Sequence, residues 1–125
     1  MPTFDDVRRI ALSLPESEEL VTWETDITFR VGGKIFAMGG EGGDRVSIKA
    51  TPFVQEALLE RDPGTFARAA YVGRFGWVTV DLGRADLGEL ERLLSDAWRM
   101  TAPKRLAGSG GLPRPSRRAR PRDDR

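Results

Sequence analysis

The chain is 125 residues long, which leaves room for one domain with one hydrophobic core. Hydrophobic residues make up 39% of it and charged residues 31%, as in water-soluble globular proteins, and no apolar run approaches the roughly 18 residues that span a bilayer. Cysteine and histidine are absent, which excludes disulfides, thiolate metal sites, and catalysis by a cysteine nucleophile or a histidine base.

The first residues predict a helix rather than a targeting signal. Thr3 can cap this helix, and Asp5 and Asp6 follow in the first turn, where carboxylates favour the helix dipole. An apolar stripe at helical spacing continues until Pro15: Phe4, Val7, Ile10, Ala11 and Leu14. A signal peptide needs positive charge at this place, so we expect the protein to remain in the cytoplasm.

The hydrophobic period then changes to two, which predicts strands. Residues 20–23 form a short strand, and residues 27–31 and 34–38 form a hairpin around Gly32-Gly33, whose positive φ angles suit a two-residue turn. The turn predicts the cross-strand pairs Val31–Lys34, Arg30–Ile35, Phe29–Phe36, Thr28–Ala37 and Ile27–Met38. The core face then holds Ile27, Phe29, Val31, Phe36 and Met38, and the other face holds Thr28, Arg30, Ile35 and Ala37.

Further elements complete an α+β pattern. After a glycine-rich turn, residues 45–49 form a strand with Val46 and Ile48 inward, and a helix runs from Pro52 to the Asp62-Pro63-Gly64 stop. Residues 76–82 form a strand with Val78, Val80 and Leu82 inward and Trp77, Thr79 and Asp81 outward, and a strongly amphipathic helix follows Asp86. We therefore expect a two-layer sandwich, an antiparallel sheet with helices packed on one face.

Catalytic signals are weak. The stretch from Gly39 to Gly43 lacks the spacing of a phosphate-binding loop and precedes a strand, so it reads as a turn. Ser95 has no histidine partner anywhere. The carboxylates of Glu24, Asp26, Asp44 and Asp81 can meet as an acid–base pair or hold a metal ion, but acidic residues in turns are better explained by solubility. We predict no enzymatic activity, no catalytic residues, no metal and no cofactor.

One group of residues points to binding instead. By the strand alternation Trp77 points away from the core face, beside Lys49, Arg30 and Ile35, and Lys34 begins the neighbouring strand. A tryptophan among cations can stack a base or an aromatic ligand while the cations hold phosphates. The alternative is that a loop or the middle helix covers Trp77, or that it is an ordinary outward-facing aromatic of a strand.

The charge is divided between a body and a tail. Residues 1–102 carry 12 Lys and Arg against 17 Asp and Glu, and residues 103–125 carry 8 against 2, so the body is at −5 and the rest at +6. Residues 107–125 are almost devoid of apolar side chains, so we expect a disordered basic tail after a domain of residues 1–106. Its arginines either bind nucleic-acid phosphates without reading sequence or remain solvated: Arg114, Arg117, Arg118, Arg120 and Arg122.

Three segments form a recognisable set: FRVGGKIFA (residues 29–37), GWVTVDL (residues 76–82), and the helix end at residues 97–106. Together they resemble the MmcQ/YjbR-like family, and the similarity covers residues 3 to about 106. The resemblance implies a two-layer fold like that of the frataxin-related CyaY proteins, no established enzymatic activity, and a DNA-binding label. Family members often carry histidine near the positions of Glu24 and Gly76, which this chain does not.

Two functions follow as hypotheses. The first is a non-enzymatic DNA-binding protein whose weak, largely sequence-tolerant nucleic-acid association uses Arg30, Lys34, Lys49 and Trp77, with help from the tail. The second is a small-molecule or protein interaction module that uses the same open sheet face and has no role on DNA. The acidic charge of the body weighs against the first, because phosphate neutralisation needs a basic surface. We expect no membrane partner.

Overall fold

The computed structural model of the chain describes residues 1–22 and 26–107. Three longer helices occur in these ranges, α1 (Phe4–Ser13), α2 (Pro52–Arg61) and α3 (Leu87–Thr101), with a short 3₁₀ turn, η1 (Gly73–Phe75), and a short last helix, α4 (Lys104–Ala107). The strands are β1 (Glu18–Thr22), β2 (Asp26–Val31), β3 (Lys34–Gly40), β4 (Arg45–Ile48), β5 (Phe66–Arg68) and β6 (Val78–Asp81). No helix within the described ranges is long and apolar enough to cross a membrane.

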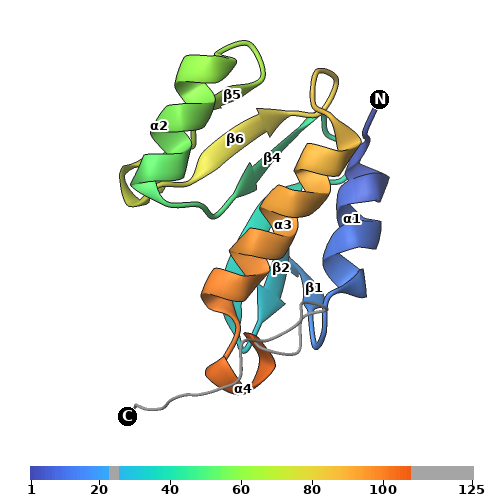
Figure 1. Ribbon diagram of the computed structural model, residues 1–125. Helices are drawn as coiled ribbons and strands as arrows, with labels where there is room; N and C mark the ends of the chain where they lie inside the picture. The colour runs from blue at the N-terminus through green and yellow to red at the C-terminus, as the bar shows by residue number, and fades with distance from the viewer. Residues whose placement is uncertain (23–25, 108–125) are drawn as a thin grey trace.

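The six strands form one antiparallel sheet in the order β1-β2-β3-β4-β6-β5. Helix α3 crosses the middle of the sheet, with α1 beside it on one side and α2 on the other (Figure 1). The core lies between this helical layer and one face of the sheet; its largest fully buried side chain is Trp98 of α3. The expected α+β sandwich is confirmed.

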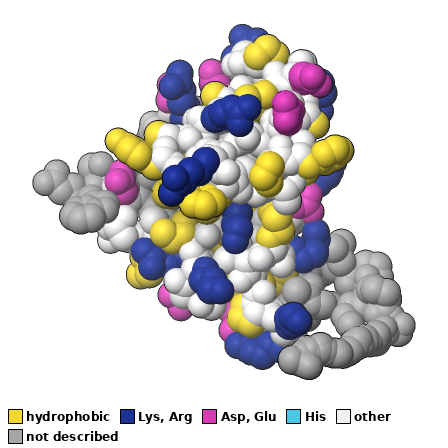
Figure 2. Space-filling view, turned by 90° about the vertical axis from the view of Figure 1, so that its left-hand side faces the viewer, with side chains coloured by type: hydrophobic (Ala, Val, Ile, Leu, Met, Phe, Trp, Pro, Cys, Tyr) yellow, Lys and Arg dark blue, Asp and Glu magenta, His cyan; other side chains and the backbone are white. Residues whose placement is uncertain are grey.

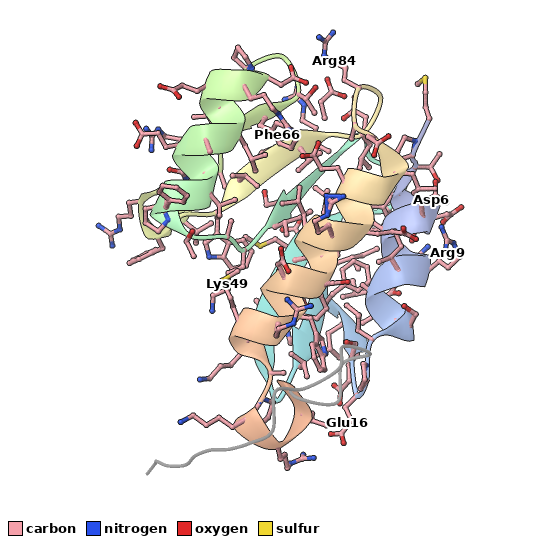
Figure 3. The ribbon with its side chains drawn as sticks, in the orientation of Figure 1. Asp6, Arg9, Glu16, Lys49, Phe66 and Arg84 are labelled. Carbon is pink, nitrogen blue, oxygen red and sulfur yellow. The ribbon has the colours of Figure 1, made fainter. Side chains whose placement is uncertain are left out.

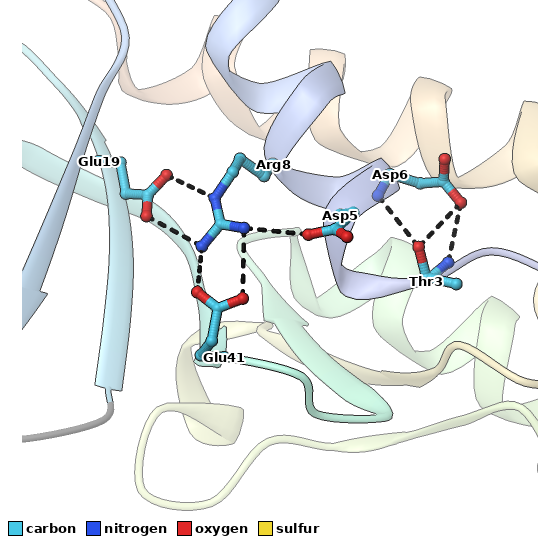
Figure 4. A network of polar contacts seen from close by, with 6 residues as sticks. All are labelled: Thr3, Asp5, Asp6, Arg8, Glu19 and Glu41. Atoms are coloured by element: carbon cyan, nitrogen blue, oxygen red, sulfur yellow. Dashed lines mark hydrogen bonds and ion pairs between the residues drawn. The ribbon is translucent and has the colours of Figure 1, made fainter.

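The helices begin where the sequence places their caps. The Thr3 hydroxyl accepts a hydrogen bond from the Asp6 N–H (3.3 Å), and the Asp6 carboxylate accepts one from the Thr3 N–H (2.9 Å), which forms a capping box (Figure 4). The Thr51 hydroxyl caps α2 by accepting from the Val54 N–H, and the Asp86 carboxylate caps α3 by accepting from the Glu89 N–H. Each cap satisfies a backbone donor that the first turn leaves free.

The β2–β3 hairpin contains a bulge that the sequence did not reveal. Gly32 and Gly33 have φ angles of 61° and 80°, and the predicted pairs Val31–Lys34 and Arg30–Ile35 are confirmed. Beyond them the register shifts by one, so that Phe29 lies opposite Ala37 rather than Phe36. The predicted pairs Phe29–Phe36, Thr28–Ala37 and Ile27–Met38 are therefore wrong.

The bulge has a packing reason. The extra residue lets both Phe36 and Ala37 enter the core, although Ala37 was predicted on the opposite face. Met38, predicted in the core, instead lines a hollow on the open face. Gly39 takes the next core position, where the ring of Phe4 lies 2.8 Å from the place of a Cβ atom, so only glycine leaves room for that ring.

The remaining differences concern short elements. The first strand runs from Glu18 to Thr22 instead of residues 20–23, and the strand expected at residues 76–82 is confined to Val78–Asp81. Strand β5 was not predicted, because three residues with one buried side chain give no readable alternation. Helix α4 carries Leu106 into the core, and residues 107–125 of the predicted tail lie outside the described residues except for Ala107.

Candidate functional site

The four predicted binding residues of the domain occupy different places. Arg30 lies on the open face of the sheet, where its Nε donates to the Thr28 hydroxyl (3.1 Å). Lys34 is exposed at the tip of the hairpin. Lys49 lies between α2 and α3 (Figure 3), and Trp77 is only 8% exposed, so its ring offers little surface for stacking. The structure does not bring these four side chains together into one hollow.

The open face of the sheet is hollowed. The hollow has a volume of about 560 Å³ and is lined by strands β2, β3, β4 and β6, with Arg30, Ile35 and Met38 among its residues. Its floor is polar, because the hydroxyls of Ser47 and Thr79 lie 3.1 Å apart on neighbouring strands. The loop that carries Tyr71 forms part of its rim.

Three aromatic side chains are exposed on α2 and on the segment between β5 and β6, and one of them, Tyr71, lines this hollow. Tyr71 is 95% exposed, Phe53 on α2 is 83% exposed and Phe75 in η1 is 59% exposed. The guanidinium of Arg74 lies 4.8 Å from the centre of the Phe75 ring. We call the group of Phe53, Arg68, Tyr71, Arg74 and Phe75 the aromatic–basic surface. Exposed aromatics grouped with cations are typical of interaction sites.

The segment that carries Tyr71 and Phe75 is held against α2. Gln55 is 2% exposed, and its Nε2 donates to the carbonyl oxygens of Gly73 (2.7 Å) and Trp77 (2.8 Å). Its Oε1 accepts from Arg68 Nη1 (2.7 Å). Gly76, at φ 101°, packs so closely on the first turn of α2 that a Cβ atom would lie 2.6 Å from the Thr51 carbonyl carbon. The exposed rings therefore sit on a fixed backbone.

This segment also links two of the predicted residues. Tyr71 shares the open-face hollow with Arg30. At the other end, Gly76 contacts Thr51, which shares a second hollow with Lys49. Arg30 and Lys49 therefore flank the aromatic–basic surface rather than forming one cluster. Figure 2 shows basic and hydrophobic side chains interspersed over the side of the molecule that faces left in Figure 1, with acidic side chains mainly toward its margins.

On the side of α1, in contrast, cations are neutralised by carboxylates. Arg8 forms ion pairs with Asp5, Glu19 and Glu41, which join α1 to β1 and to the β3–β4 turn (Figure 4). Hydrogen bonds to Glu19 and Glu41 raise the pKa of Arg8, and the bond from Arg8 lowers the pKa of Glu41. Among the described residues, Arg74 and Lys49 have no ion-pair partner. Two cations without an ion-pair partner therefore lie on or next to the aromatic–basic surface, although the body as a whole is acidic.

Sequence reasoning missed Phe53, Tyr71, Arg74 and Phe75. The signal for three of them was the segment YVGRFGW (residues 71–77), in which aromatics, arginine and glycine follow one another without strand or helix periodicity. Gln55 was missed because a single glutamine on a short helix resembles a surface residue. The tail arginines and Glu24 lie outside the described residues.

Comparisons with known proteins agree on one family. Residues 12–100 match the family model described as YjbR. Uncharacterized protein Mb2600 of Mycobacterium bovis and Uncharacterized protein Rv2570 of Mycobacterium tuberculosis are each 30% identical over 120 residues, covering 85% of this chain and 93% of the relative. A crystal structure of Deinococcus radiodurans protein DR2400, with the domain DUF419, superposes with a TM-score of 0.76 at 28% identity, covering 90% of this chain and 91% of that one.

Proposed function

The chain belongs to the YjbR family, and the relatives compared above carry no assigned activity. From its own surface, we propose that it is a non-enzymatic protein that binds nucleic acid weakly and with little sequence preference. The observation that carries this proposal is the aromatic–basic surface, in which Tyr71, Phe53 and Phe75 are exposed and Arg74 lies against the Phe75 ring. Bases stack on exposed aromatic rings, and guanidinium groups hold the backbone phosphates.

The geometry favours single strands over duplexes. Bases in a duplex are already stacked on each other, whereas unpaired bases are free to lie on aromatic side chains. The backbone of the segment that carries Phe75 is held by Gln55 and by the close packing of Gly76. Little conformational freedom is therefore lost there when a strand binds. Arg30 and Lys49 flank the surface and extend the path of positive charge for the backbone of the strand.

The test measures fluorescence anisotropy of a labelled thymidine oligomer of about a dozen nucleotides, added to the full chain at several salt concentrations. We expect Phe75→Ala and Arg74→Glu to weaken binding, since loss of one stacking partner costs about 1–3 kcal/mol. Leu87→Ala and Arg84→Glu are the matched controls. Leu87 and Arg84 are exposed and follow β6, while η1 precedes it, so they lie beyond the opposite end of that strand. Arg84 is labelled in Figure 3.

The contribution of the tail to oligonucleotide binding is measured separately. Changing the five tail arginines from Arg114 to Arg122 to glutamine keeps the domain intact and removes up to five phosphate contacts. We expect the log–log salt slope on a single strand to become shallower by about 3 to 4, and to leave a slope of about −2 from Arg30, Lys49 and Arg74. If the glutamine variant does not bind, or if Arg74→Glu behaves like Arg84→Glu, the domain is not the binding site.

The hollow on the open face favours a second candidate function, a small-molecule interaction module. Its volume of about 560 Å³ and its mixed lining of Arg30, Thr79 and Ile35 suit a polar metabolite. A ligand screen by thermal shift, followed by Ser47→Leu to fill the hollow, distinguishes the two. A stabilising ligand that is lost in Ser47→Leu, together with unchanged oligonucleotide binding, supports the module.

A further inference from the structure

A second hollow lies on the helical side of the molecule, apart from the open face. It has a volume of about 320 Å³ and opens between the start of α2 and the second half of α3. Its apolar wall consists of Ala50, Val54, Leu93 and Met100. Met100 is exposed and Leu93 is half-buried, so the wall is accessible from solvent. This volume is at the lower end of the range of small-molecule pockets.

The rim of the hollow is charged and carries one net positive charge. Lys49, Arg99 and Asp96 all line it. Asp96 is paired with Arg99 (Nη1 to Oδ1, 2.7 Å), whereas Lys49 has no ion-pair partner among the described residues. The Nε of Arg99 is buried and has no hydrogen-bond acceptor among the described residues. The ion pair with Asp96 therefore leaves one N–H of the guanidinium without an acceptor.

The adjoining end of α2 adds to the positive potential. Its first turn contains no acidic residue, and the partial positive charge of a helix N-terminus is then not neutralised locally. An apolar wall under a rim with one uncompensated cation matches one class of ligand.

We propose that this hollow binds a small amphipathic monoanion, a carboxylate with an aliphatic or aryl body. The apolar body packs on Val54, Leu93 and Met100, and the carboxylate pairs with the ammonium of Lys49. A polyphosphate is disfavoured, because Asp96 lies on the same rim and the wall offers it no polar partners. The proposal is independent of the nucleic-acid function and holds whether or not that function does.

The methionines provide the readout. The sequence has three, of which Met100 lines this hollow and Met38 lines the open-face hollow. The full chain, labelled with ¹³C at the methionine methyl groups, is titrated with octanoate and followed by NMR. We expect the Met100 resonance to shift to saturation with a Kd of about a millimolar or somewhat lower, while Met38 stays in place.

Charge variants of ligand and protein test the role of Lys49. We expect Lys49→Gln to weaken octanoate about three- to tenfold and to leave octanol unchanged, with Lys34→Gln as the control for loss of one positive charge. Octylammonium is expected to bind no better than octanol. The proposal is overturned if octanoate does not shift Met100, if Met38 shifts equally, or if Lys49→Gln or the sign of the ligand charge has no effect.

Discussion

The buried amide of Gln55 donates a 2.8 Å hydrogen bond to the carbonyl oxygen of Trp77, across 22 positions of the chain. The same nitrogen donates to Gly73, and the amide oxygen accepts from Arg68. One side chain on α2 therefore fixes both ends of the segment that carries Tyr71, Arg74 and Phe75. The carbonyls of Gly73 and Trp77 each accept from Gln55 and from one backbone N–H, those of Gly76 and Ala69.

Replacing this amide should loosen the aromatic–basic surface. We expect Gln55→Leu to lower the free energy of unfolding by about 1–3 kcal/mol, because the carbonyls of Gly73 and Trp77 each lose one of two donors and Arg68 loses its acceptor. Oligonucleotide affinity should fall as well, although Gln55 itself is not exposed. Urea unfolding and anisotropy measure the two effects, and Glu56→Leu, an exposed neighbour on the same helix, is the control. Equal stability of the two variants contradicts this role of Gln55.

The bulge in β3 makes a second prediction. Ala37→Leu should destabilise the protein by about 1–3 kcal/mol, because Ala37 packs in the core opposite Phe29 and additional methyl groups overfill it. Met38→Leu should cost much less, since Met38 lines the open-face hollow. Chemical denaturation of both variants measures the difference. The reverse order is expected if Phe29 pairs with Phe36, as the unbulged register requires.

Phe29 and Phe36 remain core residues despite the shifted register. Both are fully buried, and the ring of Phe29 lies 5.9 Å from that of Phe4 on α1. We expect Phe29→Ala or Phe36→Ala to cost about 3–5 kcal/mol each, a large part of the stability of a domain of this size. Thermal unfolding by circular dichroism checks this, and a drop in Tm no larger than that of Leu12→Ala, at an exposed position, refutes it.

Stability should fall on acidification through a few identified carboxylates. The hydrogen bond from Arg8 lowers the pKa of Glu41 from its ordinary 4.5, and the bond from the Thr65 hydroxyl lowers the pKa of Asp62 from its ordinary 3.8. A carboxylate whose pKa is lower in the folded state stabilises the fold above its unfolded pKa, and this contribution disappears as the pH falls through the folded pKa.

We therefore expect Tm to be nearly constant from pH 7 down to about 5 and to decrease below about 4.5. In Arg8→Gln the Glu41 contribution is absent, so the Tm at pH 6 should be lower and its decrease on acidification smaller. Thermal melts of both proteins between pH 6 and 3 compare the two slopes. Parallel curves show that Arg8 does not couple the proton equilibrium of Glu41 to folding.

Removal of the tail should leave the domain intact. A chain ending at Ala107 keeps Leu106, which is buried in the core, and we expect its Tm to match that of the full chain. We also predict rapid amide exchange for residues 109–125, which contain only Leu112 and Ala119 as apolar residues apart from glycine and proline. Protected amides there, or a lower Tm on truncation, establish that the tail packs on the domain.

The sequence by itself determined the helices, their caps and the face of most strand residues. Thr3, Thr51 and Asp86 cap the helices through contacts three residues away, and Val46, Ile48, Val78 and Val80 alternate over short distances. Such local rules need no knowledge of the rest of the chain. The family resemblance of residues 29–37 was readable for the same reason.

Only the tertiary structure decided the bulge and the candidate site. The register of β3 depends on the Phe4 ring, which occupies the space above Gly39 and comes from a helix 35 positions away along the chain. The exposure of Tyr71 and Phe75 depends on hydrogen bonds from Gln55, and the charge balance around Lys49 depends on α3. Non-local packing and polar satisfaction have no sequence period, so they became visible only when distant segments were placed side by side.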